Sequence, residues 1–292
     1  CIRDRLTPVA VGTIDHVLMC GLKTPHVVLR HIGLLSKVLV IDEIHSSDTY
    51  MESYLQALLS WCGALGVPVI ALSATLSDAR RQLLVDAYRH GQGHLPREVA
   101  PAGAASQITR VDSEGGITCT AVPAGVTSRA VACSLVGDEP DIEHVVDTVR
   151  ARGGVVGLIA DTVTRAQDWY ERVSQLCAGV DVEVVLLHSR FTDADRAARE
   201  QDLVSRCGRG GVRPDKMIVV STQVIEQALD LDFDYMVTDV APVDSLIQRA
   251  GRVHRHAETR RPAVFATPRV DICGVDDARF ARGVDRVYSP WL

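Results

Sequence analysis

Long apolar runs are missing from the 292-residue sequence, in which no stretch approaches the ~20 uninterrupted apolar residues of a membrane-spanning helix. No segment that is first basic and then apolar, as a signal peptide would be, stands at the N-terminus. We therefore expect no membrane partner.

Closely spaced cysteines are also missing. The eight cysteines are scattered, and the nearest two, Cys119 and Cys133, lie fourteen positions apart. This spacing provides neither a C-x-x-C redox motif nor a Cys/His zinc site. Several cysteines sit among apolar residues and are expected to be small buried side chains in a reducing cytoplasm.

An excess of positive charge is the third absence, because 31 Lys and Arg residues face 37 Asp and Glu residues and the net charge is −6. A chain of this charge does not hold nucleic acid by bulk electrostatics, so any such binding must be local. The apolar fraction of 47% excludes disorder as the main character of the chain, and its length predicts two domains.

Short apolar runs alternate with segments of helical periodicity in both halves of the chain. Strands are expected at 37–42, 67–72, 154–160, 183–187, 216–221 and 234–240, and helices at 48–65, 162–178, 192–205 and from 243. This alternation predicts an α/β fold with two parallel-sheet domains. Residues 91–137 are rich in Gly, Pro, Ser and Ala, and we expect an inter-domain connector with β-hairpin character there.

Polar clusters follow the first two expected strands. Asp42, Glu43 and His45 come directly after the first, where one carboxylate can order a magnesium ion and the other can polarise an attacking water. The alternative is a polar strand end that caps the next helix. Ser73, Ala74 and Thr75 follow the second strand and could couple to the acidic cluster. The alternative is simple N-capping of a helix over 77–90 by Ser77 or Thr75.

A third cluster, Gln248, Arg249, Arg252 and Arg255, lies near the end of the second α/β half. Arginines spaced by three share one face of a helical turn and suit a polyphosphate whose charge grows in the transition state. The alternative is a solvated basic helix end.

The order of these clusters resembles that of a superfamily 2 helicase of the DExH type. Further segments narrow the resemblance to the helicase portion of the CRISPR-associated helicase-nuclease of type I systems. These segments are Val11–Asp15, Ser46–Met51, Trp61, Ile159–Val163, Leu187–Phe191 and Ser221–Asp232. The likeness runs from about residue 9 to the C-terminus.

The resemblance implies two RecA-like domains that clamp ATP and pull single-stranded DNA in the 3′→5′ direction. It implies a first RecA-like domain in residues 1–90, truncated at its N-terminus, and a second in 138–270. The connector would be 91–137, and 271–292 would begin a C-terminal extension. A crRNA-guided surveillance complex would recruit the full-length protein.

The resemblance also implies roles for individual positions. Asp42 would hold Mg²⁺ and Glu43 would orient the hydrolytic water, while His45, Ser73, Ala74 and Thr75 would couple hydrolysis to domain closure. Arg252 and Arg255 would reach the terminal phosphate, supported by Gln248 and Arg249, and Asp230 would lie near the ribose. The implied DNA-backbone contacts are Thr13, Thr162, Arg165, His188, Arg190, Thr222 and Gln223.

Two features of the family are missing from the sequence. No G-x-x-x-x-G-K-[ST] phosphate loop precedes Asp42, since Gly21–Thr24 lacks a second glycine and falls after Thr13. No His-Asp dipeptide, the mark of the nuclease domain, occurs anywhere. We expect a fragment that binds ATP poorly and does not turn it over. The open alternatives are a helicase-like scaffold that has lost the loop and a related motor that acts on RNA.

Overall fold

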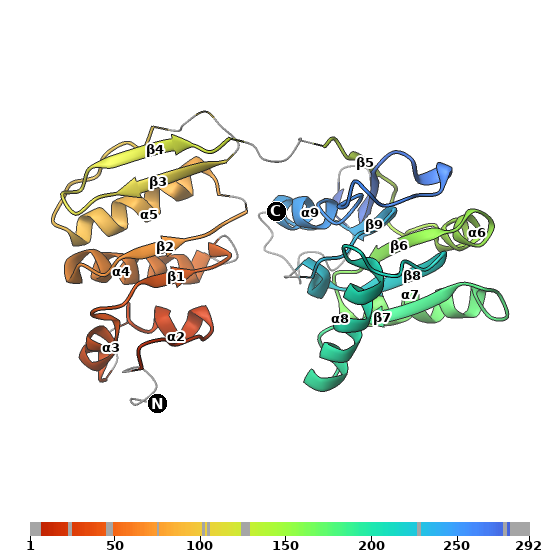
Figure 1. The fold of residues 1–292 in the computed structure, drawn as a ribbon, viewed down its shortest axis with the longest axis horizontal. Helices are drawn as coiled ribbons and strands as arrows, with labels where there is room; N and C mark the ends of the chain where they lie inside the picture. The colour runs from red at the N-terminus through yellow and green to blue at the C-terminus, as the bar shows by residue number, and fades with distance from the viewer. Residues whose placement is uncertain are drawn as a thin grey trace. The chain divides into compact units, whose positions relative to one another are not determined.

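The computed structural model describes residues 7–22, 25–44, 49–74, 76–100, 103, 106–123, 129–226, 229–276 and 279–280. The chain divides into two compact units, residues 1–127 and 128–292, and each is described by itself (Figure 1). In the described part of the chain no helix is long and apolar enough to cross a membrane.

The first unit places two helices against a small parallel sheet. Its elements are α2 (Ile14–Leu18), α3 (Val27–Leu34), β1 (Leu39–Ile41), α4 (Thr49–Leu65), β2 (Val69–Ala71), α5 (Asp78–Gly91), β3 (Gln107–Val111) and β4 (Ile117–Ala121). Strand β1 pairs with β2 in parallel, with Leu39 opposite Val69 and Ile41 opposite Ala71. This is the β-α-β arrangement that the apolar runs predict.

Helices α4 and α5 lie unusually close to each other because glycines face the contact. A Cβ atom on Gly63 would lie 2.1 Å from the Tyr88 carbonyl oxygen, and one on Gly91 would lie 1.9 Å from the Ser60 carbonyl oxygen. The two backbones therefore touch where any side chain would separate them. Below this contact, α4 contributes fully buried Leu55 to the core of the unit.

One face of the β1–β2 sheet is apolar and open to solvent. Val40 on β1 and Val38 just before it are 56% and 55% exposed, and Ile70 on β2 and Leu72 just after it are both 48% exposed. The parallel register puts Val40 beside Ile70, so the four side chains form one patch, which we call the open sheet face.

Strands β3 and β4 form an antiparallel hairpin next to α5. Its turn is built by the Asp112 carboxylate, which accepts hydrogen bonds from the Glu114 and Gly116 amides at 2.9 and 2.7 Å. Arg89 of α5 donates to the Gly115 carbonyl at 2.9 Å. The hairpin is thereby attached to the first unit.

The second unit is a six-stranded parallel sheet covered on both faces. Its elements are β5 (Ala132–Leu135), α6 (Ile142–Arg152), β6 (Gly154–Ile159), α7 (Val163–Leu176), β7 (Glu183–Leu187), α8 (Asp193–Cys207), β8 (Lys216–Ser221), η2 (Gln223–Glu226), β9 (Tyr235–Asp239), α9 (Val243–Ala250), η3 (Ala263–Phe265), β10 (Arg269–Cys273), β11 (Val275–Asp276) and β12 (Arg279–Phe280). The strand order is β5-β10-β9-β6-β8-β7.

The central strands are buried on both sides, which explains their continuous apolar sequences. Alternate residues of β6 enter two cores: Val156 packs with α6 and α7, and Val155 packs with α8. Residues Ala132–Leu135, which fall inside the 91–137 stretch of the sequence, form β5 and pair with β10 at one edge of this sheet. Strand β7 forms the other edge.

Candidate functional site

The acidic pair of the first unit lies at the carboxyl end of β1. Asp42 and Glu43 are both exposed, and an Asp42 oxygen accepts the Glu43 backbone N–H at 3.0 Å. Glu43 has a φ of 50°, a left-handed conformation that is uncommon for a residue with a side chain. Strain of this kind is typical of functional sites.

Neighbouring β2 ends beside this pair. The Ile44 amide donates to the Leu72 carbonyl at 3.0 Å, so Ser73 and Ala74 follow immediately alongside Glu43. The cap of α5 is Ser77, whose hydroxyl accepts the Arg80 amide at 3.3 Å. Ser77 is one of the two N-cap candidates that the sequence offers, so the N-capping prediction is confirmed at Ser77.

Three further predicted positions concern the first unit. His45 and Thr75 lie outside the described residues. Thr13 is exposed at the start of α2, and its hydroxyl makes no capping hydrogen bond to that helix.

The Asp42 carboxylate fits a magnesium ion that is shared with phosphate. It is exposed, and it is a hard oxygen ligand of the kind through which Mg²⁺ is usually held by one or two carboxylates, waters and substrate phosphates. In the part of the chain that the structure describes, no group of three or more His, Cys, Asp or Glu side chains could hold a metal ion.

In the second unit, the predicted DNA contacts gather at the carboxyl ends of adjacent strands, where parallel sheets bind ligands. Thr162 follows β6, Thr222 follows β8 and His188 follows β7, and these strands are neighbours in the sheet. Gln223 donates to the Asp161 carbonyl at 2.7 Å across this edge. Exposed Thr162 also caps α7, accepting the Arg165 amide at 3.2 Å.

Arg165 is largely occupied within the unit. Its guanidinium pairs with Asp239 at 2.9 Å and Glu139 at 2.6 Å, donates to the Asp138 carbonyl at 3.1 Å and lies over the Trp169 ring. Burial raises the pKa of the Asp239 carboxyl, although the charge of Arg165 opposes that shift. A phosphate contact by Arg165 would have to compete with these partners.

Arg249 is fully buried, unlike a residue that reaches out to a ligand. Its guanidinium pairs with Glu226 at 2.6 Å and Asp161 at 3.4 Å, and it donates to Thr238 Oγ1 at 2.7 Å. It therefore links α9 to η2 and to the ends of β6 and β9. This position suits a residue that supports the neighbouring arginines and does not itself contact a phosphate.

The remaining members of the arginine cluster lie where residues 229–233 and 251–256 run side by side, linked by the Phe233–Val253 bridge. Arg252 is 8% exposed and donates to the carbonyls of Leu229 and Glu226. Exposed Arg255 pairs with Asp230 at 2.8 Å. The predicted ribose and phosphate residues are therefore direct partners.

Two positions complete the predicted set. Gln248 is half-buried on α9, beside Arg249 in the sequence, and exposed Arg190 lies three residues beyond the end of β7.

Buried aspartates are the residues that the sequence reasoning missed. Asp232 accepts hydrogen bonds from the Arg255 amide and the Thr259 hydroxyl and pairs with Arg261 at 2.7 Å. Asp234 pairs with Arg261 and with Arg213 and accepts the Val155 amide at 2.7 Å. The sequence feature that could have identified these aspartates is the strict alternation of apolar residues with aspartate over 229–234, a period of two in an extended segment.

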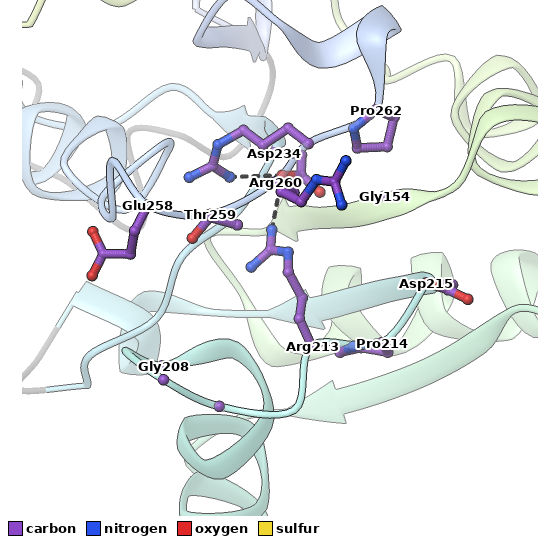
Figure 2. Close-up of a pocket in the computed structure, with 13 residues that line it drawn as sticks. Gly154, Gly208, Arg213, Pro214, Asp215, Asp234, Glu258, Thr259, Arg260 and Pro262 are labelled. Carbon is purple, nitrogen blue, oxygen red and sulfur yellow. Dashed lines mark hydrogen bonds and ion pairs between the residues drawn. The ribbon is translucent and has the colours of Figure 1, made fainter.

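A pocket of about 520 Å³ lies beside this aspartate cluster (Figure 2). Gly154, Asp215 and Asp234, at or just before the starts of β6, β8 and β9, line it, so the pocket sits at the amino ends of the strands. Figure 2 shows Arg213 reaching towards Asp234, with which it forms a 2.9 Å ion pair. None of the predicted site residues lines this pocket.

Comparison with known proteins places these motifs in a family. The family model described as "CRISPR-associated nuclease/helicase Cas3, C-terminal" matches residues 152–258. The CRISPR-associated nuclease/helicase Cas3 of Streptococcus thermophilus is 38% identical over 290 residues, which cover 97% of this chain and 31% of that protein.

Solved structures agree with the sequence relatives. A crystal structure of T. fusca Cas3-AMPPNP is 35% identical with a TM-score of 0.89, covering 99% of this chain and 35% of that one. A pre-nicking CRISPR RNA-guided surveillance complex contains a chain that is 35% identical with a TM-score of 0.86, covering 98% of this chain and 37% of that one. The chain thus spans about a third of the length of these relatives, and over that span it is similar to the helicase portion of the CRISPR-associated nuclease/helicase Cas3.

Proposed function

We propose that this chain is the helicase region of an ATP-dependent motor that moves 3′→5′ along single-stranded DNA in CRISPR interference. The observation that carries the proposal is the meeting of Asp42 and Glu43 with Ser73 and Ala74 at the carboxyl ends of paired β1 and β2. An exposed acidic pair beside small residues suits a nucleotide whose hydrolysis must be sensed by the fold.

In this proposal Asp42 holds Mg²⁺, which neutralises charge on the phosphates when it is bound. Glu43 orients the attacking water and accepts its proton. Ser73, Ala74, Thr75 and His45 couple hydrolysis of the nucleotide to domain closure. Residues 1–90 supply these groups as the first RecA-like domain.

The second domain, residues 138–270, supplies the positive charge. Arg255 is the exposed member of the cluster, and it would exchange Asp230 for a phosphate while Asp230 turns to the ribose. Arg252 and buried Arg249 hold the surrounding backbone, with Gln248 beside them. The connector lies within residues 91–137, of which Ala132–Leu135 already belong to the second sheet as β5. The extension lies within residues 271–292, after the end of β10 at Cys273.

Single-stranded DNA would lie along the carboxyl edge of the second sheet. Its backbone would contact Thr162, His188, Arg190, Thr222 and Gln223, with Thr13 contributing from the first unit. Hydroxyl and amide groups bind phosphates without reading bases, which suits a motor. Since a relative occurs in a CRISPR RNA-guided surveillance complex, we propose the same class of partner for the full-length protein.

The reading frame upstream of Cys1 and an ATPase assay together test the proposal. The 292-residue chain should show no DNA-stimulated turnover, because its sequence has no phosphate loop. A longer protein that includes such a loop should hydrolyse ATP faster with single-stranded DNA than with RNA. In that protein, Glu43→Gln should lower kcat by about 10²–10⁴-fold.

Exposed Glu98, in the same unit, provides the matched control, and Glu98→Gln should leave kcat unchanged. Robust magnesium-dependent turnover by the 292-residue chain alone would contradict the expected inactivity. An upstream frame without any phosphate loop would favour a binding scaffold, and preferential stimulation by RNA would favour an RNA motor.

A further inference from the structure

A three-layer stack stands at the carboxyl end of edge strand β7. The Phe191 ring lies parallel to the His188 ring, with centroids 4.3 Å apart and planes 10° apart. The Arg199 guanidinium lies over Phe191, 4.4 Å from its centroid. The layers therefore run from a buried imidazole through a half-buried benzyl ring to an exposed cation.

The inner layer fixes the geometry of the stack. His188 is 4% exposed, and its Nδ1 accepts the backbone N–H of Arg190 at 3.2 Å. This hydrogen bond ties the Arg190 backbone to the stack. Burial lowers the pKa of the imidazole, and the positive charges of Arg190 and Arg199 lower it further. The inner layer is thus an uncharged aromatic support at neutral pH.

Arg199, the outer layer, and Arg190, next to Phe191 in the sequence, both lack the carboxylate partners that most arginines of this unit have. Among the described residues, neither Arg190 nor Arg199 forms an ion pair, and the only polar contact of the Arg199 side chain is a 3.4 Å hydrogen bond to the Leu186 carbonyl. Arg196, one turn away on α8, pairs with Asp193 and Glu200. Two unneutralised cations therefore flank Phe191 in a chain of net charge −6.

Planar cations supported by an aromatic ring suit a nucleotide. Guanidinium groups stack on nucleobases, and arginine also binds phosphate oxygens with its fork of donors. Stacking needs no particular base, since every base has a π-face. The stack also lies at the carboxyl ends of the strands, as Thr222 and Thr162 do.

We propose that Arg199, supported by Phe191, forms a stacking subsite for one base of single-stranded DNA, and that Arg190 binds an adjacent phosphate. This subsite rests on the proposed function, since it refines how the same edge holds DNA. Phe191 acts through Arg199 and is a positioning residue.

The test compares the affinity of the 292-residue chain for two fluorescent oligonucleotides of equal length and charge, one an ordinary single strand and one abasic. Arg199→Ala should weaken binding of the ordinary strand by about five- to tenfold and leave binding of the abasic strand unchanged. Phe191→Leu should do the same, and Phe191→Trp should restore the base-dependent part.

Arg190→Ala should lower the affinity for the ordinary and the abasic oligonucleotide equally. It should also reduce the slope of log Kd against log salt by about 0.7, the value for one phosphate contact with a single-stranded oligonucleotide. Arg196→Ala, on the same helix, should change neither. Thermal unfolding of each variant confirms that the unit is folded.

The outcomes separate the two levels of the proposal. Absence of single-stranded DNA binding by the wild-type chain would overturn the subsite together with DNA binding by this edge. Wild-type binding that Arg199→Ala leaves intact, or weakens equally for both oligonucleotides, would overturn the subsite alone.

Discussion

Aspartates 232 and 234 show how single residues hold the second unit together. Both are about 1% exposed or less, and both are paired with Arg261. A buried ion pair costs desolvation, but removal of one partner leaves the other charge uncompensated. These carboxylates are therefore needed once the arginines are in place.

We predict that Asp232→Asn lowers the free energy of unfolding of the second unit by about 3–5 kcal/mol, because it leaves Arg213 and Arg261 to share a single buried carboxylate, that of Asp234. Urea denaturation followed by circular dichroism measures this change. Asp193→Asn is the matched control, since that side chain is 96% exposed and should change stability by less than about 0.5 kcal/mol. Equal stability of the two variants would contradict the prediction.

His254 should make stability depend on pH. It is 8% exposed, and burial lowers the pKa of its imidazole, with a further contribution from Arg261. A depressed pKa means that the fold prefers the neutral ring. The resulting stability is complete above the unfolded value of about 6.5 and is lost as the pH falls through the folded pKa.

The expected result is that unfolding free energy falls between pH 7.5 and pH 5 more steeply in the wild type than in His254→Asn. Asparagine tolerates the φ of 52° at this position. His144→Asn, on an exposed position of α6, should keep the wild-type slope. Parallel pH profiles for wild type and His254→Asn would exclude this role.

Helices α4 and α5 illustrate the scale of whole elements. The distances at Gly63 and Gly91 show that the two backbones meet directly. Gly91→Ala should therefore force the helices apart and lower the free energy of unfolding by about 1–3 kcal/mol. Gly12→Ala is the control, because the nearest atom to its Cβ would be 3.5 Å away. A Gly91→Ala variant as stable as Gly12→Ala would show that the contact adapts.

Strands and helices were largely predictable, and the α/β class with a parallel sheet is confirmed. The apolar run at 154–160 became β6 because a strand buried on both faces needs continuous apolar side chains. The family resemblance is also confirmed. The assigned roles of Asp42, Arg255 and the DNA-edge residues stay predictions.

Other features could not be predicted because they depend on contacts between distant segments. The spacing of the arginines in the sequence does not distinguish Arg249 from Arg255 as a ligand contact. In the structure Arg249 is buried and Arg255 is exposed. Similarly, the sequence around Arg165 does not predict its ion pair with Asp239, which lies seventy-four positions away. Tertiary structure decides which member of a charged motif faces solvent.

At the scale of the molecule, the open sheet face is a large apolar surface without cover among the described residues of its unit. Contiguous apolar patches of this kind mark places of association. We predict that the 292-residue chain binds the dye ANS and self-associates, and that Val40→Lys with Ile70→Lys reduces both. Val212→Lys, at an isolated position that is 86% exposed, should change neither. Unchanged dye fluorescence in the double variant would show that this face is not the binding surface.

The pairing of β5 with β10 has a consequence for the order of events during synthesis. Ala132 lies opposite Arg269, so among the described strands the one made first in the second unit pairs only with the strand made last of the six. At roughly 5–20 residues per second, the stretch between Leu135 and Arg269 takes about 7–27 s to synthesise, and β5 lacks its partner for that time. Until β10 has emerged from the ribosome, one edge of the nascent sheet is unfinished, and an unpaired strand edge of this kind is prone to pair with other chains.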